Sequence, residues 1–283
     1  MSSILEVRSL SKSFGRGRRR SQALDDVSFT VEPGTITGLV GESGSGKTTI
    51  IRCIMGLESA DSGEILFEGE SLAKSGFNHR RRLAKDVQLV FQDPTASLNP
   101  RMRVEDIICE GMIVHELYGD AARRREEAGR LLEMVGLAER DLPRYPASFS
   151  GGQRQRIAIA RALAVQPKLL VCDEPVSALD VSVQAQVLGL LVDMQRDLNL
   201  SLLFVAHNLA VVKQVCSVVH VLNRGRIVES GDAGTVLSQP ADPYTQSLLE
   251  AVPVPDPEVA KERLAVRLAA RAARRAAAEG TTA

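Results

Sequence analysis

The sequence lacks any run of about 20 apolar residues, which is the length that a membrane-spanning helix requires. Its first residues, MSSILEVRSLSKSF, also lack the apolar core of a signal peptide. We therefore expect a chain that is made and kept in the cytosol and that reaches a membrane only through a partner.

The chain also lacks net charge, because 35 Lys and Arg residues balance 35 Asp and Glu residues. A dedicated nucleic-acid-binding protein is usually basic, so we expect no nucleic-acid partner. Hydrophobic residues make up 44% of the sequence and charged residues 25%, which is typical of globular domains. At 283 residues the chain can bury a sizeable core, as one large domain or one and a half.

Cysteine is scarce and scattered. Cys53, Cys109, Cys172 and Cys216 lie far apart and form no CxxC pair. This spacing excludes a zinc ribbon and an iron–sulfur cluster. We expect all four to be reduced and to act as small, partly buried apolar side chains.

The first third of the chain predicts strands around a loop. Residues 27–31 alternate apolar and polar side chains and end at a turn over 32–34. The apolar run 36–40 follows, then a glycine-rich loop and a helix over 48–55, and 65–67 is a further strand.

The middle of the chain is helical in pattern from about residue 104 to 136. Gly136 suits a C-cap, and the apolar residues at i, i+3, i+4 and i+7 are Ala128, Leu131, Leu132 and Val135. We interpret this segment as an inserted helical subdomain. Strands then resume, with helices between them and a final hairpin, at 169–172, 201–206, 218–222 and 226–228.

A glycine-rich motif, GESGSGKT, fills residues 41–48 and fits GxxxxGK[ST] between an apolar strand and a helix. Glycines let backbone N–H groups curl around phosphate oxygens, and the helix N-terminus adds positive potential. We expect Lys47 to reach the β- and γ-phosphates of ATP and the Thr48 hydroxyl to ligate Mg²⁺. The expected nucleotide contacts are Gly41, Glu42, Ser43, Gly44, Ser45, Gly46, Lys47, Thr48 and Thr49.

The segment LLVCDE, residues 169–174, supplies an acid for the metal. Four apolar residues predict a buried strand with Asp173 at its carboxyl end, where ligands bind in such sheets. Asp173 is expected to bind Mg²⁺ directly or through water, and Glu174 to act as the base that polarises the attacking water. By itself, an acid pair at a strand end would favour a plain loop start; the phosphate loop favours the functional interpretation.

The segment FSGGQRQR, residues 149–156, resembles the signature sequence of the ABC ATPase family, with Phe149 where the usual form has Leu. As in the phosphate loop, a glycine-rich turn opens a helix, which makes an anion site. The resemblance implies half of an ATP-clamped dimer. The residues expected to close on the γ-phosphate held by a second subunit are Ser150, Gly151, Gly152 and Gln153.

Three further elements occur in the order that the family predicts. Gln92 matches the loop that touches Mg²⁺ and water and relays nucleotide state to the membrane subunits. Residues 177–180 match the segment that crosses the dimer interface, which places Asp180 near the nucleotide. His207 matches the switch histidine that contacts the γ-phosphate. The resemblance thus implies the catalytic residues Lys47, Gln92, Glu174 and His207 and the Mg²⁺ ligands Thr48, Gln92 and Asp173.

Phe14 matches the upstream aromatic residue on which adenine stacks in this family. Stacking of a base on an aromatic ring is worth ~1–3 kcal/mol in nucleic-acid sites. Packing in the core is the alternative role for this ring. The arginine-rich segment 16–20 that follows is expected to be a solvated loop.

Residues 91–101, 173–188 and 242–257 look like the ATPases of oligopeptide and dipeptide importers. Such importers pair two non-identical ATPases with two membrane permease subunits and work with an extracytoplasmic substrate-binding protein. The resemblance implies a peripheral subunit on the cytoplasmic side of the cell membrane. Some relatives carry nickel or glutathione, so these cargoes stay open beside peptides.

Two other classes share parts of this pattern. A soluble ABC ATPase that acts on DNA or ribosomes would usually carry a long coiled-coil insertion or two ATPase halves, and this sequence has neither. A small-molecule kinase would share the phosphate loop but would not need FSGGQ or SALD. The sequence therefore favours the transport ATPase.

The expected fold is an α/β P-loop NTPase (RecA-like) core with an N-terminal antiparallel β subdomain and an inserted helical signature subdomain. We assign 1–92 and 158–240 to the core with its β subdomain, 93–157 to the signature subdomain and 241–283 to a C-terminal extension. Its tail is rich in Ala and Arg and is expected to be solvated and partly frayed, with contact to acidic lipid or a partner as the alternative. Four arginines would form one cationic stripe on a helix there: Arg263, Arg267, Arg271 and Arg275.

Overall fold

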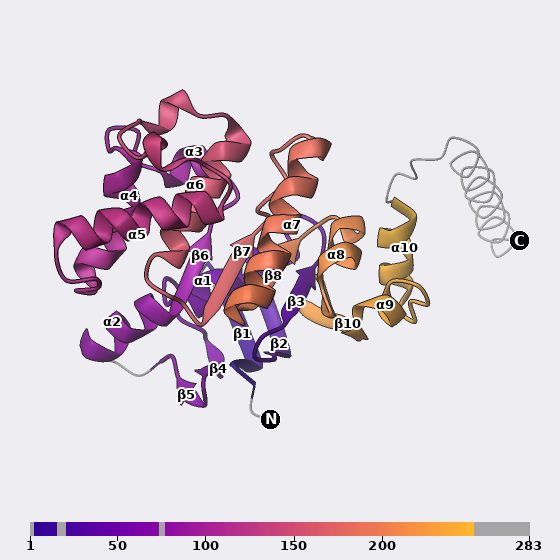
Figure 1. Cartoon of the computed structure of the whole chain (residues 1–283). Helices are drawn as coiled ribbons and strands as arrows, with labels where there is room; N and C mark the ends of the chain where they lie inside the picture. Colours follow the sequence, from indigo (N-terminus) through magenta and orange to yellow (C-terminus); the bar gives the residue numbers. More distant parts are fainter. Residues whose placement is uncertain (1–2, 16–20, 74–76, 252–283) are drawn as a thin grey trace, which may run out of the picture.

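A computed structural model describes residues 3–15, 21–73 and 77–251, which form two β-sheets with helices packed around them (Figure 1). The larger sheet has the strand order β10-β9-β3-β8-β7-β6. Its strands are parallel except for β10, which pairs antiparallel with β9 at one edge. They are β3 (Ile36–Val40), β6 (Val87–Val90), β7 (Leu169–Asp173), β8 (Ser201–Ala206), β9 (Val218–Asn223) and β10 (Arg226–Asp232).

The smaller sheet is antiparallel and has the order β2-β1-β4-β5. Its strands are β1 (Leu5–Phe14), β2 (Ser21–Val31), β4 (Ser62–Phe67) and β5 (Glu70–Ser71). Helix α1 (Lys47–Ile54) buries Ile50 and Ile54 in an apolar cluster that joins this sheet to one face of the larger sheet. The expected α/β fold with an antiparallel β subdomain is therefore confirmed.

Side chains on successive strand residues point to opposite faces of the larger sheet, and both faces are buried. Leu170 and Cys172 of β7 belong to one apolar cluster, whereas Leu169 and Val171 belong to the other. Strands β3, β7 and β8 are covered on both faces, so their sequences are mainly apolar without regular alternation. This explains why β3 and β8 begin and end where their apolar runs do.

Helices α3 to α6 gather on one side of the molecule in Figure 1 and include the predicted helical insertion. Positive φ angles at Glu116, Tyr118 and Gly119 break the region expected to be helical into two helices, and Gly136 ends the second at φ +74°. The expected boundary between residues 157 and 158 falls within α6, so the sheet core and the insertion share this helix. The helices are α2 (Phe77–Asp86), α3 (Pro94–Ser97), α4 (Val104–Val114), α5 (Ala121–Met134), η2 (Glu139–Asp141), η3 (Pro146–Ser148) and α6 (Gly151–Leu163).

The remaining helices are α7 (Val181–Leu198), α8 (Leu209–Val215), α9 (Ala233–Val236) and α10 (Pro243–Ala251). Helix α10 follows the β9–β10 hairpin, whose turn has positive φ at Arg224 and Gly225. The arginine-rich segment 16–20 and the Ala/Arg-rich tail lie outside the described residues. No helix in the described ranges is both long and apolar enough to cross a lipid bilayer.

The four cysteines are free, as expected, and all but the half-buried Cys216 are buried. Burial raises the pKa of Cys109 to about 11, against a usual value near 9. A thiol with a raised pKa stays protonated and is a poor nucleophile. These residues therefore serve packing.

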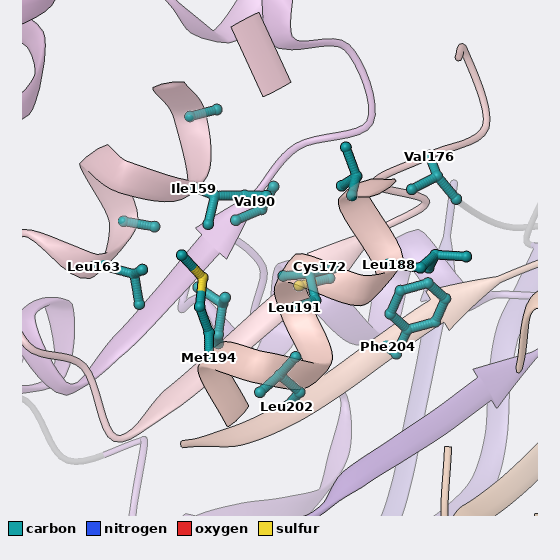
Figure 2. Close-up of a cluster of buried hydrophobic side chains, with 14 of the residues drawn as sticks. Val90, Ile159, Leu163, Cys172, Val176, Leu188, Leu191, Met194, Leu202 and Phe204 are labelled. Carbon is teal, nitrogen blue, oxygen red and sulfur yellow. The ribbon is translucent and has the colours of Figure 1, made fainter. Parts of the chain in front are cut away.

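Helix α7 packs against the larger sheet through an apolar face (Figure 2). Leu188, Leu191 and Met194 of this helix belong to one buried apolar cluster with Leu202 and Phe204 of β8. Residues three or four apart form one apolar face of α7, and alternate residues of β8 form one apolar face of the sheet, so the two faces pack together.

We expect Leu191→Ala to lower the free energy of unfolding by about 2–5 kcal/mol, because it leaves a cavity between α7 and the sheet. Leu191 is 2% exposed, whereas Leu198 at the end of the same helix is 46% exposed. Leu198→Ala should therefore change the unfolding free energy by less than about 0.5 kcal/mol. Urea unfolding measures both, and equal losses in the two variants would contradict the assignment of the buried face.

Candidate functional site

One cavity of about 770 Å³ opens at the carboxyl ends of the parallel strands. The segments that follow β3, β6, β7 and β8 all contribute to it, as expected for ligand sites in such sheets. Its volume is in the range of a small-molecule site. It is lined by Ala23, Glu42, Ser43, Gly44, Gly46, Lys47, Thr48, Thr49, Gln92, Asp173, Glu174, His207, Asn208, Leu248 and Ala251.

The loop from Gly41 to Gly46 curls tightly between β3 and α1. A Cβ on Gly46 would lie 2.8 Å from the Ala23 carbonyl oxygen, and the residue has φ +115°, which favours glycine. In the described residues, the buried Ser45 hydroxyl has no hydrogen-bond partner, and the first turn of α1 carries no acidic side chain and no side-chain cap. The N–H groups at this helix start are therefore open to an anion such as phosphate.

Lys47 is buried in the first turn of α1 and holds the loop closed from inside. Its Nζ donates to the carbonyl oxygens of Gly41 at 2.7 Å and Glu42 at 2.9 Å. Nζ also lies 3.9 Å from Oε1 of Glu174. Burial lowers the pKa of Lys47, although Glu174 and Asp173 oppose this effect. A phosphate would favour the charged form of this ammonium group.

Glu174 is held by side chains from the segments that follow β6 and β8 and by the backbone of β8. Gln92 Nε2 donates to its Oε2 at 3.2 Å, and His207 Nδ1 lies 2.9 Å from the same oxygen. An ionised carboxylate only accepts hydrogen bonds, so His207 carries a proton on Nδ1 in this contact. The backbone of Glu174 has φ +45°, and its N–H donates to Val205 O at 2.9 Å. Strain of this kind persists where surrounding structure fixes a functional residue.

Asp173 is half-buried at the end of β7, beside Glu174. Burial and the neighbouring Glu174 raise the pKa of Asp173, whereas Lys47 opposes the shift. A cation beside this carboxylate would favour its ionised form. Thr48 and Gln92 line the same cavity. Mg²⁺ in nucleotide sites takes one or two protein ligands together with phosphate oxygens, so these donors fit it.

The signature segment lies elsewhere. Ser150 caps α6 and forms a capping box with Gln153, at 2.9 Å and 3.3 Å. A Cβ on Gly151 would contact Leu179 at 3.6 Å, which places this helix start beside residues 177–180. Of the described residues that line the cavity, none comes from 150–153.

Asp180 caps α7 and accepts from Val183 N at 3.0 Å and from the Ser182 hydroxyl at 2.8 Å. These hydrogen bonds lower the pKa of Asp180, and the one from Val183 N has the largest effect. Within the described chain, Asp180 does not line the cavity either. Its charge therefore lies at the start of α7, and that helix start is beside the start of α6.

Phe14 ends β1 and is 39% exposed, so it does not pack in the core. Lys12 Nζ lies 5.3 Å from the centre of its ring, and this buried ammonium also donates to Ser59 O at 2.6 Å. Among the described residues that line the cavity, Ala23 and not Phe14 represents this sheet. Contact of Phe14 with adenine stays a prediction.

Comparisons with known proteins identify the family. The profile described as ABC transporter matches residues 24–177. The chain belongs to the ABC transporter family. A second profile, described as oligopeptide/dipeptide transporter, C-terminal region, matches residues 228–280.

Individual relatives of this ABC transporter chain agree with the family. The oligopeptide transport ATP-binding protein OppF of Streptococcus mutans is 50% identical over 266 residues, which cover 92% of this chain and 85% of that protein. OppF of Bacillus subtilis is 46% identical over 264 residues, with coverages of 92% and 86%. Among solved structures, the dimeric post-hydrolysis state of the ATP-binding cassette MJ0796 bound to ADP and Pi has a TM-score of 0.73 at 26% identity, and the match covers 81% of this chain and 99% of that one.

Four residues that line the cavity are not predicted by the sequence motifs of the ABC transporter family: Ala23, Asn208, Leu248 and Ala251. Asn208 directly follows the predicted His207, so its position could have been inferred. Leu248 and Ala251 come from α10. Their segment resembles the importer extension, but no local pattern in the sequence shows that α10 folds back on the phosphate loop.

We expect Gly41→Ala to weaken ATP binding and to lower the free energy of unfolding by about 1–3 kcal/mol. The added Cβ would lie 2.2 Å from the Leu222 carbonyl oxygen and 2.7 Å from Ser45 Oγ, so the loop must move. Gly189→Ala is the control, because a Cβ there has no atom within 4 Å in the described structure and the position lies inside α7. Urea unfolding and ATP titration check both variants. A Gly41→Ala protein with unchanged stability and affinity would contradict the tight loop.

Proposed function

We propose that this chain is the ATP-hydrolysing subunit of an ABC importer that takes up oligopeptides or dipeptides. One observation carries the proposal: Glu174 is held by Gln92 and His207 at the edge of a cavity formed by a phosphate-binding loop. The peptide cargo is supported by the profile match over 228–280 and by relatives named oligopeptide transport ATP-binding protein.

Glu174 is the base of the proposed reaction. Its carboxylate accepts a proton from the water that attacks the γ-phosphate, while the bond from phosphorus to the β–γ bridging oxygen breaks and ADP leaves. Gln92 and His207 both contact Oε2. Lys47 Nζ, which lies 3.9 Å from Oε1, turns to the phosphates in this proposal, so Oε1 is the oxygen that receives the proton. His207 and Gln92 thus orient the base and stand where the γ-phosphate would arrive.

Lys47 and the loop bind the phosphates in this proposal. Lys47 Nζ exchanges the carbonyl oxygens of Gly41 and Glu42 for β- and γ-phosphate oxygens. Backbone N–H groups at the start of α1 donate to the same phosphates. Thr48, Gln92 and Asp173 would hold Mg²⁺, which supplies positive charge to the phosphate oxygens when bound.

The signature segment serves an ATP that a second subunit holds. Helix α6 begins at Ser150 and Gly151, next to Leu179, so one surface presents the start of this helix together with the predicted dimer segment. These residues do not line this chain's own cavity in the described structure, which supports a site composed from two chains. MJ0796, a 26% identical cassette, has been solved as a dimer.

We further propose the assembly that the importer resemblance implies. The second ATPase is non-identical, two permease subunits span the membrane, and an extracytoplasmic substrate-binding protein delivers the cargo. The chain then sits on the cytoplasmic side of the cell membrane as a peripheral subunit. Residues 1–92 and 158–240 serve as the core, 93–157 as the signature subdomain and 241–283 as the extension.

The roles of Lys47 and Glu174 should separate in the assembled transporter. Lys47→Ala should weaken ATP binding and abolish turnover, because it removes the phosphate contact. Glu174→Gln should keep ATP binding and lower kcat by about 10²–10⁴-fold, because the amide cannot accept the proton. ATP titration and phosphate release measure these effects.

Wild-type turnover in Glu174→Gln, with the partner's own base also replaced, would contradict the assignment. Cargo is tested separately by uptake of a labelled tripeptide in cells that express the complex, with nickel ions and glutathione as competitors. The peptide cargo would be rejected by one result: nickel or glutathione blocks the uptake, but an excess of unlabelled peptide does not.

Gly151→Asp should lower ATP hydrolysis of the complex by tenfold or more while ATP binding to the isolated chain is unchanged. A carboxylate at the start of α6 stabilises the helix but repels an arriving phosphate, and like charges in contact cost several kcal/mol. Gly151→Asn, of the same size but neutral, is the control and should lose much less activity. Weakened ATP binding to the isolated Gly151→Asp chain would contradict the two-chain site.

A further inference from the structure

Helix α10 of the C-terminal extension reaches the phosphate-binding loop through one tyrosine. Tyr244 accepts a hydrogen bond from the backbone N–H of Glu42 at 3.1 Å. Leu248 and Ala251, which line the nucleotide cavity, follow at i+4 and i+7 and so lie on the same face of the helix. One face of α10 is therefore a wall of the site.

We propose that Tyr244 is a positioning residue for ATP binding: its hydroxyl holds the first peptide group of the phosphate-binding loop in the shape that receives phosphate. The inference rests on the proposed ATPase function and deepens it. It gives the C-terminal extension a role at the nucleotide site of its own chain.

The start of α10 is fixed to the same sheet that carries the loop. Glu229 of β10 accepts from the backbone N–H groups of Ala241 at 2.8 Å and Asp242 at 3.2 Å. The Asp242 carboxylate in turn accepts from Tyr244 N at 2.7 Å. Strand β10 pairs with β9, and β9 pairs with β3, the strand that enters the loop. Tyr244 is thus anchored to a rigid frame and not to a mobile segment.

Glu42 is held on two sides. Its carbonyl oxygen accepts from Lys47 Nζ at 2.9 Å and from Ser45 N at 3.2 Å, within the loop. Its N–H is held from outside by Tyr244. When Lys47 turns to the phosphates, the inner contact to Lys47 is lost, but the contact to Tyr244 takes no part in that exchange. Tyr244 then keeps the loop from opening at the moment when ATP binds.

This geometry predicts an effect on affinity and not on turnover. Within the described residues, the hydrogen bonds of the Tyr244 side chain include none to Glu174, Gln92 or His207. Removal of the hydroxyl leaves the base and its partners in place. Without the hydroxyl, the peptide group of Glu42 is free and must be ordered again when ATP binds. ATP binding is therefore weaker by about the free energy of one hydrogen bond.

The test is Tyr244→Phe in the full-length chain, which removes only the hydroxyl. We expect the Kd for ATP to rise about two- to tenfold, while kcat of the assembled transporter at saturating ATP stays within about twofold of wild type. Hydrogen exchange at the Glu42 amide should become faster in the same variant. Glu229→Gln, which loosens the start of α10, should raise the Kd in the same direction.

Tyr118→Phe is the matched control. Its hydroxyl accepts from Gln166 at 2.9 Å and donates to Glu127 at 3.4 Å, away from the cavity, so its loss should not alter the Kd. An unchanged Kd in Tyr244→Phe, or an equal rise in Tyr118→Phe, would overturn the inference. Wild-type protein that binds no ATP would instead overturn the proposed function, so the two failures are distinct.

Discussion

The parallel pairing of β3, β8, β7 and β6 is the constraint on which the site depends. Val40 pairs with Ala206, Asp173 with Val205, and Val90 with Cys172, so the four strands end within about one residue of the same edge. The segments that follow them must therefore meet. The functional residues are far apart in the sequence, from the phosphate loop to His207. They form one site because the strands that carry them end at the same edge.

The same burial that makes this sheet rigid made much of it predictable. Strands covered on both faces are continuous apolar runs, so β3 and β8 could be bounded from the sequence, and motifs at their ends could be expected to meet. The contact between Tyr244 and Glu42 could not, because it joins residues 202 positions apart and no period or motif encodes it. Phe14 shows a different limit: it matches the family's aromatic position less securely than the other motifs do, because an arginine-rich insertion follows it, and its ring lies outside the cavity-lining set in the described structure.

The charged groups of the site favour a ligand that brings both an anion and a cation. Burial lowers the pKa of Lys47 and raises the pKa of Asp173, so the fold disfavours the charged form of each group. Each group opposes the other's shift only in part. An anion beside Lys47 and a cation beside Asp173 would relieve both costs together, which is the charge pattern of a nucleotide with its metal ion.

A phosphate that binds at this site replaces existing hydrogen bonds more than it adds new ones. Lys47 already donates to two carbonyl oxygens, and Glu174 already accepts from Gln92 and contacts His207. A phosphate that takes over Lys47 or His207 must replace these bonds, so the net gain is smaller than the sum of its own contacts. In the proposed two-chain site, a modest gain in one chain leaves room for the second chain's signature helix to contribute to closure. The separation of the signature segment from the cavity is consistent with that division of binding energy between two subunits.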